Sequence, residues 1–111
     1  MPKIDQLIKQ SLGQIIHEEI EWPKHVLVTI NKVKTARDLK YAVVWVSIMP
    51  TGQAPMILKK LAKEVKHLQQ LLNERVYLRF VPKLRFEWDK TEEAADEIEI
   101  LFKQLKEEKE N

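Results

Sequence analysis

The side chains in this chain whose type and spacing could support chemistry are lysines and arginines, and they fall into three groups. Lys59, Lys63 and Lys66 are four and three residues apart, which places them on one face of a helix. A second group occupies a polar connection between two predicted strands, and a third belongs to a later strand and the residues before it. The members of these two groups are Arg37 and Lys40, then Arg75, Arg79, Lys83 and Arg85. Three basic groups on a small domain could bind phosphate, although an ordinary solvated surface explains such charge more often.

The charge is distributed unevenly along the chain. The 111 residues contain 19 Lys and Arg against 17 Asp and Glu, a formal net charge of only +2. Residues 1–90 contain 16 basic and 9 acidic side chains, a net charge of +7, whereas residues 91–111 contain 3 and 8, a net charge of −5. The sequence therefore predicts a basic body that can attract a polyanion through one face, followed by an acidic end.

Catalytic and cofactor chemistry find little support in the sequence. The chain has no cysteine, and neither of its serines, Ser11 and Ser47, lies in a Gly-x-Ser-x-Gly motif. The three histidines fall on different predicted elements without metal-ligand spacing. The two glycines, Gly13 and Gly52, are 39 positions apart, which excludes a Gly-x-Gly-x-x-Gly, Walker A or Gly-x-x-Gly loop. We therefore expect no enzyme activity, no metal and no cofactor.

Hydrophobic periodicity predicts the elements that must position the basic groups, in the order helix, strand, strand, helix, strand, helix. They cover approximately residues 4–22, 25–33, 41–49, 55–73, 79–89 and 91–105. The sequence thus favours a single-domain α+β fold with a three-stranded sheet packed by helices. Because the long helix connects the second strand to the third, these two strands are expected to be parallel if they are neighbours.

The second and third strands each carry aromatic side chains. Residues 41–49 are almost continuously apolar, which indicates a central strand covered on both faces, with Trp45 in the core. In the third strand, Pro82 has no amide hydrogen to donate, so this strand either lies at an edge of the sheet or begins immediately after it. Alternation places Phe80, Phe86 and Trp88 on one face of that strand, where we expect core residues rather than platforms for nucleobases.

The length fits one domain, which we place at residues 1–105, with residues 106–111 as an acidic tail that frays. The longest apolar stretch is far too short to span a membrane, and the N-terminus lacks the apolar region of a secretory signal. We therefore expect a cytoplasmic protein without a membrane or small-molecule partner, and a monomer is the default expectation.

Two segments, taken together, resemble the bacterial ribosome-binding factor A family. Residues 28–47 contain Val-Thr-Ile, Ala-Arg-Asp-Leu and Tyr-Ala-Val-Val-Trp-Val, where the first hairpin of that family has Val-Thr-Val, Ser-Arg-Asp-Leu and Tyr-Ala-x-Val-x-Val. Residues 79–89 resemble its Arg-x-Val-Pro-Glu-Leu-x-Phe-x-x-Asp strand. The first helix closes on Trp22-Pro23-Lys24, similar to a family helix that ends in Asp-Pro-Arg. The resemblance covers about residues 4–102.

The resemblance implies a type II KH-like fold without a Gly-x-x-Gly loop. It also implies an assembly factor, not an enzyme, that binds the free or immature 30S ribosomal subunit and its 16S ribosomal RNA and assists maturation and rRNA processing. Family members bend a helix at an Ala-x-Gly, whereas this chain has Glu64-Val65-Lys66 there, and it has Gln69 where an arginine is frequent. With this resemblance, the nine basic residues above are interpreted as contacts to RNA phosphates and RNA shape.

A second class of function stays open from the residues alone. A small interaction module could use the same basic face to bind an acidic surface of another protein, without acting on RNA. Competition separates the two hypotheses, because small-subunit RNA displaces the partner of an RNA-binding protein and is ignored by a protein-specific module. In either case, the acidic end is interpreted as a segment that stays off the partner or moderates the basic face.

Overall fold

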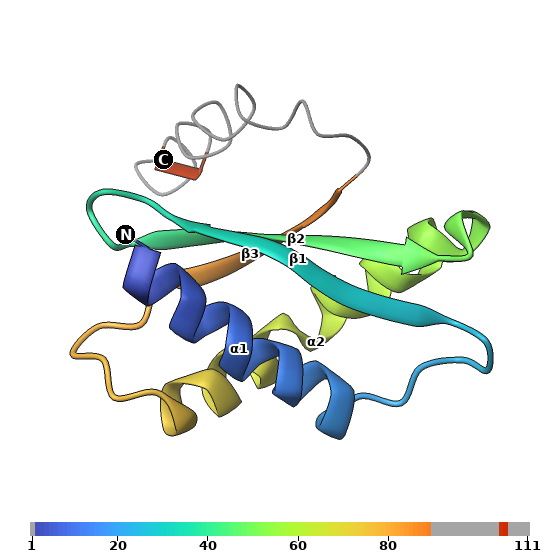
Figure 1. The fold of residues 1–111 in the computed structure, drawn as a ribbon, viewed down its shortest axis with the longest axis horizontal. Coiled ribbons are helices and arrows are strands. Elements are labelled where there is room, and N and C mark those ends of the chain that lie inside the picture. Colours follow the sequence, from blue (N-terminus) through green and yellow to red (C-terminus); the bar gives the residue numbers. More distant parts are fainter. Residues whose placement is uncertain (1, 90–104, 107–111) are drawn as a thin grey trace.

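The computed structural model of this protein describes residues 2–89 and 105–106 (Figure 1). In chain order the elements are α1 (Pro2–Glu19), β1 (Leu27–Thr35), β2 (Tyr41–Met49), a short 3₁₀ helix η1 (Thr51–Gln53), α2 (Ala54–Arg75) and β3 (Lys83–Trp88). Figure 1 shows α1 and α2 on one side of a three-stranded sheet, which confirms the α+β class. The final helix and the frayed tail predicted from the sequence lie outside the described residues, apart from Leu105 and Lys106.

The sheet has the order β1-β2-β3, so β2 is the central strand, as its continuous apolar sequence predicts. β1 and β2 pair antiparallel, with an irregularity in register at Asn31, and β2 and β3 pair parallel. The expected parallel pairing across the α2 connection is therefore confirmed. β3 begins directly after Pro82 and also lies at an edge, so both consequences expected of that proline hold.

The main core lies between the helices and the sheet. The apolar stripe of α1 and the inward face of α2 pack against the side chains of β2 that point toward them, and β3 adds Leu84. The fully buried members of this core are Ile8, Leu12, Ile15, Ala42, Val44, Val46, Ala54, Ile57, Leu61, Leu68 and Leu72. Each large aliphatic side chain removed from water in this way contributes roughly 1.5–3 kcal/mol. This burial fixes α2 against the sheet and leaves its opposite face to solvent.

The other face of β2 is also covered. Tyr41, Val43 and Trp45 do not belong to the core beneath the helices, yet they are buried, and Trp45 is only 2% exposed. The ammonium of Lys32 lies 5.3 Å from the centroid of the Trp45 ring. In Figure 1 the two described residues of the C-terminal segment lie on this side of the sheet, and Leu105 is half-buried. The expectation that Trp45 is a core residue is confirmed.

Helix α2 is continuous over 22 residues. Pro55 stands in its first turn, where a missing amide hydrogen costs nothing. The helix passes without a break through Glu64, Val65 and Lys66, the place that corresponds to the Ala-x-Gly of the resembling family. Its basic residues are therefore spaced along one regular helical surface.

Candidate nucleic-acid interface

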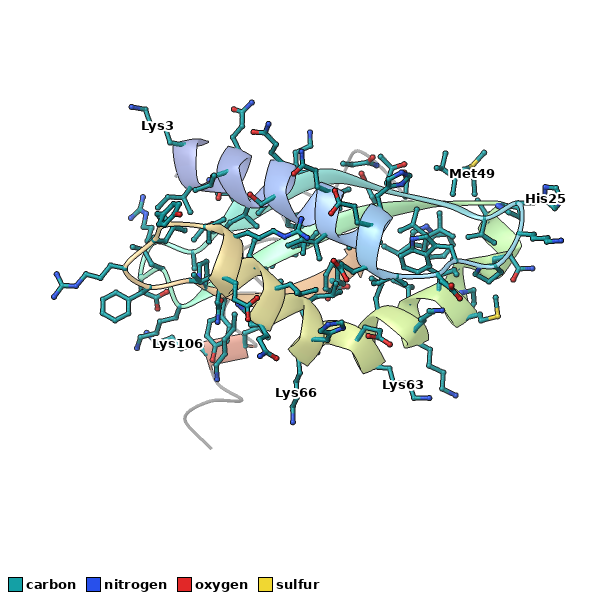
Figure 2. The ribbon with its side chains drawn as sticks, turned by 90° about the horizontal axis from the view of Figure 1, so that it is seen from below. Lys3, His25, Met49, Lys63, Lys66 and Lys106 are labelled. Carbon is teal, nitrogen blue, oxygen red and sulfur yellow. The ribbon has the colours of Figure 1, made fainter. Side chains whose placement is uncertain are left out.

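The first predicted basic group forms an exposed row on α2. Lys59, Lys63 and Lys66 are all exposed, because the buried positions of this helix fall on the opposite side. Figure 2 shows Lys63 and Lys66 pointing outward, on the side of α2 away from α1. Among the residues that the structure describes, none of the three has an ion-pair partner. At a rise of 1.5 Å per residue the row extends roughly 10 Å, and we call it the lysine row.

An open hollow of about 650 Å³ adjoins the lysine row. It is lined by Met56, Lys59, Lys60, Ala62, Lys63 and Glu64. Glu64 moderates the positive charge at one side of it, and its Oε2 lies 3.5 Å from Nδ1 of His67. The hollow is open and has lysines beside Met56 and Ala62, which suits a phosphate backbone better than a small molecule that must be enclosed.

The second predicted group meets part of the third at one end of the sheet. The turn between β1 and β2 is closed by hydrogen bonds from the amide of Ala36 to the carbonyl of Tyr41 and from Leu39 to the carbonyl of Ala36, both 2.9 Å. Leu39 takes a left-handed backbone conformation with φ of 64°, which completes the reversal of the chain. The amide of Lys83 donates to the carbonyl of Lys40 at 2.9 Å, so β3 begins beside this turn.

Three exposed cations thereby gather at this end of the sheet. They are Arg37, Lys40 and Lys83, and we call them the sheet-end group. No ion pair is found for any of them within residues 2–89 and 105–106. The structure therefore brings together two residues of the first connection and one of the third strand, which are separated by more than forty positions in the sequence.

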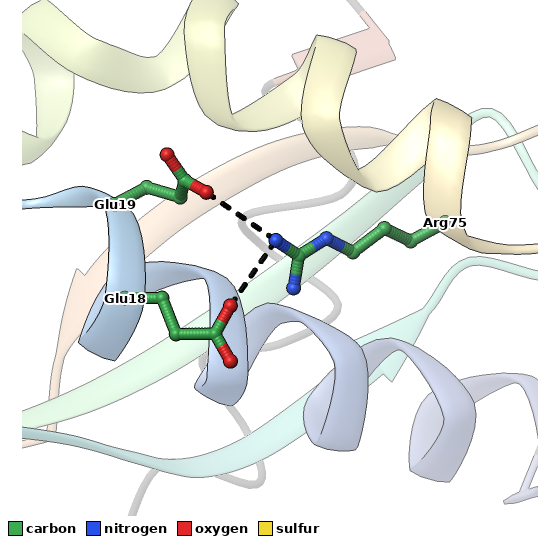
Figure 3. Close-up of polar contacts among 3 residues, drawn as sticks. All are labelled: Glu18, Glu19 and Arg75. Carbon is green, nitrogen blue, oxygen red and sulfur yellow. Dashed lines mark hydrogen bonds and ion pairs between the residues drawn. The ribbon is translucent and has the colours of Figure 1, made fainter.

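Arg75 and Arg85 are placed differently from the rest. Nη2 of Arg75 lies 3.2 Å from Oε2 of Glu18 and 3.4 Å from Oε1 of Glu19, so it joins α2 to the end of α1 (Figure 3). Arg85 pairs in register with Val43 on the sheet face opposite the helices, and its Nε lies 3.2 Å from Oε1 of Glu87. Both charges are balanced within the fold, so these two predicted contacts are less available to a polyanion than the lysine row.

The loop between α2 and β3 corrects one expectation from the sequence. Phe80 is 71% exposed and not a core residue, because β3 starts after Pro82 and the alternation of the strand does not extend back to it. Phe86 and Trp88, within the strand, do pack against the core as expected. The guanidinium carbon of Arg79 lies 5.7 Å from the centroid of the Phe80 ring. Arg79 thus belongs to this exposed loop and not to a strand face.

Comparison with known proteins gives the family. The model of the family described as ribosome-binding factor A matches residues 1–102 of the chain. The chain belongs to the ribosome-binding factor A family. A relative of that name from Chlorobium phaeobacteroides is 34% identical over 112 residues, covering 97% of this chain and 95% of the relative. One from Coxiella burnetii is 30% identical over 100 residues, covering 90% of this chain and 84% of the relative.

Solved structures of ribosome-binding factor A share the fold of this chain, which is KH-like. The crystal structure of the Thermus thermophilus protein has a TM-score of 0.69 at 24% identity, covering 78% of this chain and 92% of that one. A homology model of the same Thermus protein, fitted into a cryo-EM map of its complex with the 30S subunit, has a TM-score of 0.66 at 26% identity with the same coverage. The solution structure of a Thermotoga maritima protein, a putative ribosome-binding factor A by its description, has a TM-score of 0.60 at 25% identity, covering 85% and 87%.

Two departures from the motifs of the ribosome-binding factor A family have structural roles here. Gln69 stands where an arginine is frequent, and its Oε1 accepts a hydrogen bond from the amide of Leu84 at 3.0 Å while its Nε2 donates to the carbonyl of Pro82 at 3.1 Å. Trp22 stands in place of an aspartate, and its Nε1 donates to the carbonyl of Ile16 at 3.1 Å. Sequence reasoning missed the role of Gln69, because a glutamine on a polar helix face carries no signal of a partner 13 to 15 residues away.

The groove between α1 and β1 offers less to a polyanion. A groove of about 710 Å³ between α1 and the edge strand β1 has mostly neutral walls, with Lys9 as its one lysine and Gly13 and His17 along the helix. Within residues 2–89 and 105–106, no cluster of three or more His, Asp or Glu side chains is arranged to hold a metal ion. None of the helices described is both long enough and apolar enough to cross a membrane.

Proposed function

We propose that this protein is a ribosome-assembly factor that binds the free or immature 30S subunit, contacts its 16S ribosomal RNA and assists maturation, including rRNA processing. It acts as a cytoplasmic monomer and by binding, not by catalysis. The observation that carries this proposal is the lysine row, Lys59, Lys63 and Lys66, three exposed cations on one regular helix face without ion-pair partners in the described chain. Membership of the family and the 30S complex of the Thermus protein support it.

The proposed mode of binding is contact with phosphates and with the shape of folded RNA. The chain has no glycine loop with which to clamp a nucleic-acid backbone, so recognition rests on side chains. The lysine row and the sheet-end group supply the main contacts, and Arg79 adds to them. Arg75 and Arg85 contribute less, because carboxylates already balance their charge. We take residues 1–105 as the binding unit and the acidic residues 106–111 as outside it.

Sucrose-gradient fractionation tests the proposal. The full-length protein is mixed with small subunits, large subunits and assembled ribosomes, and its distribution is measured across the gradient. We expect it to sediment with free small subunits and not with assembled ribosomes, and purified 16S ribosomal RNA should compete for it. Sedimentation apart from all ribosomal particles would overturn the proposal.

The alternative, a module for an acidic protein surface, is separated by the competitor. If small-subunit association is an RNA contact, 16S ribosomal RNA displaces the protein at a concentration where polyglutamate of equal total charge does not. If polyglutamate displaces it equally well, the basic face has no preference for RNA shape. That result favours the protein-binding hypothesis over the RNA-binding one.

A further inference from the structure

The loop between α2 and β3 displays two aromatic side chains on the surface. Tyr77 is fully exposed and Phe80 is 71% exposed, although the neighbouring residues Val76 and Pro82 are buried. An exposed aromatic forgoes the free energy that its burial would contribute to folding. The fold therefore does not need these two rings where they are, and two exposed aromatic side chains three positions apart in one loop form a candidate binding surface.

The two ends of this loop are fixed. The amide of Val76 donates to the carbonyl of Leu72 at 3.0 Å, which continues the last turn of α2. At the other end, the side-chain amide of Gln69 holds both the carbonyl of Pro82 and the amide of Leu84. A loop with anchored ends presents its side chains in a restricted region, which lowers the entropy lost when a ligand binds.

A cation lies beside the Phe80 ring, and further cations lie at the same end of the sheet. The guanidinium of Arg79 lies against the Phe80 ring, with 5.7 Å between its central carbon and the ring centroid. Figure 1 shows this loop at the same end of the sheet as the turn between β1 and β2, and the bond from Lys83 to the carbonyl of Lys40 ties β3 to that turn. From Arg75 to Phe86 the sequence contains no acidic residue. The Phe80 ring is thus flanked by positive charge, and the loop itself carries no acidic side chain.

We propose that Tyr77 and Phe80 stack on unpaired nucleobases of RNA while Arg79 and Lys83 contact the adjoining phosphates. The inference rests on the proposed function, in which the lysine row contacts phosphates and not bases. Aromatic faces can stack on any base, and single-stranded loops are where RNA exposes such bases. A protein partner fits less well, because an apolar protein surface would have to desolvate Arg79 beside the Phe80 ring. This loop therefore directs the protein to unpaired segments of the RNA.

A fluorescent single strand tests this inference. The probe is a short oligoadenylate with one 2-aminopurine, compared with the same strand paired to oligouridylate. We expect the wild-type protein to quench the 2-aminopurine emission and to bind the single strand more tightly than the duplex. The Tyr77→Leu/Phe80→Leu variant should bind the single strand at least about 10-fold more weakly, with unchanged duplex affinity and an unchanged salt slope. Both side chains are exposed, so the melting temperature should not change.

A matched control changes two other exposed apolar side chains. Leu27 and Met49 pair across β1 and β2 and are 63% and 59% exposed. Leu27→Ala/Met49→Ala should leave single-strand binding as in the wild type. The stacking inference is overturned if the Tyr77→Leu/Phe80→Leu variant binds the single strand as well as the wild type does, or loses duplex affinity equally.

The two proposals fail separately. A wild-type protein that stacks on the probe but sediments apart from small subunits refutes the proposed function and leaves stacking in place. If the wild type and the Tyr77→Leu/Phe80→Leu variant sediment equally with small subunits, and neither quenches the probe, stacking is refuted. The proposed function then stays in place.

Discussion

The two sides of α2 carry the same kind of charge and use it differently. On the side toward α1, Arg75 bridges Glu18 and Glu19, and the ammonium of Lys60 donates to the carbonyl of Glu21. These contacts, with the Lys60 ammonium lying over the Trp22 ring, join α2 to the end of α1 and to the chain that follows it, and we call them the helix seam. On the side away from α1 stands the lysine row, which has no ion-pair partner in the described chain.

The difference shows that a basic residue must be judged by its partners and not by its spacing. A cation that is paired with a carboxylate must give up that partner before it can replace a counterion on an RNA phosphate. It therefore adds little to salt-dependent binding. An exposed, unpaired cation adds roughly one phosphate contact. The comparison therefore predicts that substitutions at the helix seam lower stability, whereas substitutions in the lysine row lower RNA affinity.

The largest effect is expected at the helix seam, from Trp22→Ala. Its ring packs against the core, its Nε1 donates to the carbonyl of Ile16, and the ammonium of Lys60 lies 5.9 Å from the ring centroid. We expect the free energy of unfolding to fall by about 3 kcal/mol, measured by urea denaturation. Affinity for small subunits should be unchanged at a temperature where the variant is folded. A fall in affinity without a fall in stability would show that the seam itself contacts RNA.

The next effect concerns the lysine row, substituted together as Lys59→Gln/Lys63→Gln/Lys66→Gln. Loss of three phosphate contacts should weaken binding to small subunits roughly 100-fold at about 0.1 M salt and lower the salt slope by about 2 to 3. The melting temperature should not change, because all three side chains are exposed. A titration of binding against salt concentration measures both quantities.

The matched control for the lysine row removes the same charge elsewhere. Lys3, Lys9 and Lys24 are exposed on α1 and in the connection that follows it. Their replacement by glutamine lowers the net charge equally, so it should weaken binding only slightly through the overall field. Equal losses in the two variants would mean that net charge alone drives binding and that the lysine row has no special place.

Much of the fold could be predicted from the sequence because its determinants are local. The continuous apolar run predicted β2 at residues 41–49, and Pro82 left two alternatives for the third strand, an edge position or a start after the proline, both of which hold. The roles of individual polar side chains could not be predicted, because their partners are distant in the chain. Arg75 meets carboxylates 56 and 57 residues away, and the exposure of Phe80 depends on a strand that starts after it.

A smaller effect is expected when the ion pairs of the helix seam are removed by Arg75→Gln. The guanidinium is one-third exposed and its partners are more so, which limits such pairs to roughly 0.2–1 kcal/mol. We expect a loss of stability in this range that shrinks as salt is added, and a change in small-subunit affinity of less than about 2-fold. A double-mutant cycle with Glu18→Gln measures the coupling. If Arg75→Gln instead lowers affinity as much as the substitution of one lysine of the lysine row does, the arginine exchanges its carboxylates for phosphate on binding.

The last prediction concerns the acidic end and its influence on the lysine row. Deletion of residues 106–111 removes Glu107, Glu108 and Glu110 but also two lysines, so the three glutamates are better replaced by glutamine, which keeps the length. If the acidic end moderates the basic face, non-specific RNA affinity should rise about 2- to 5-fold at low salt, and the gain should fade near 1 M salt, where the Debye length is about 3 Å. In the Lys59→Gln/Lys63→Gln/Lys66→Gln background the same substitution should raise RNA affinity less, because the positive field that the glutamates moderate is then weaker. An equal gain in both backgrounds would mean that the glutamates repel RNA directly, without acting through the row.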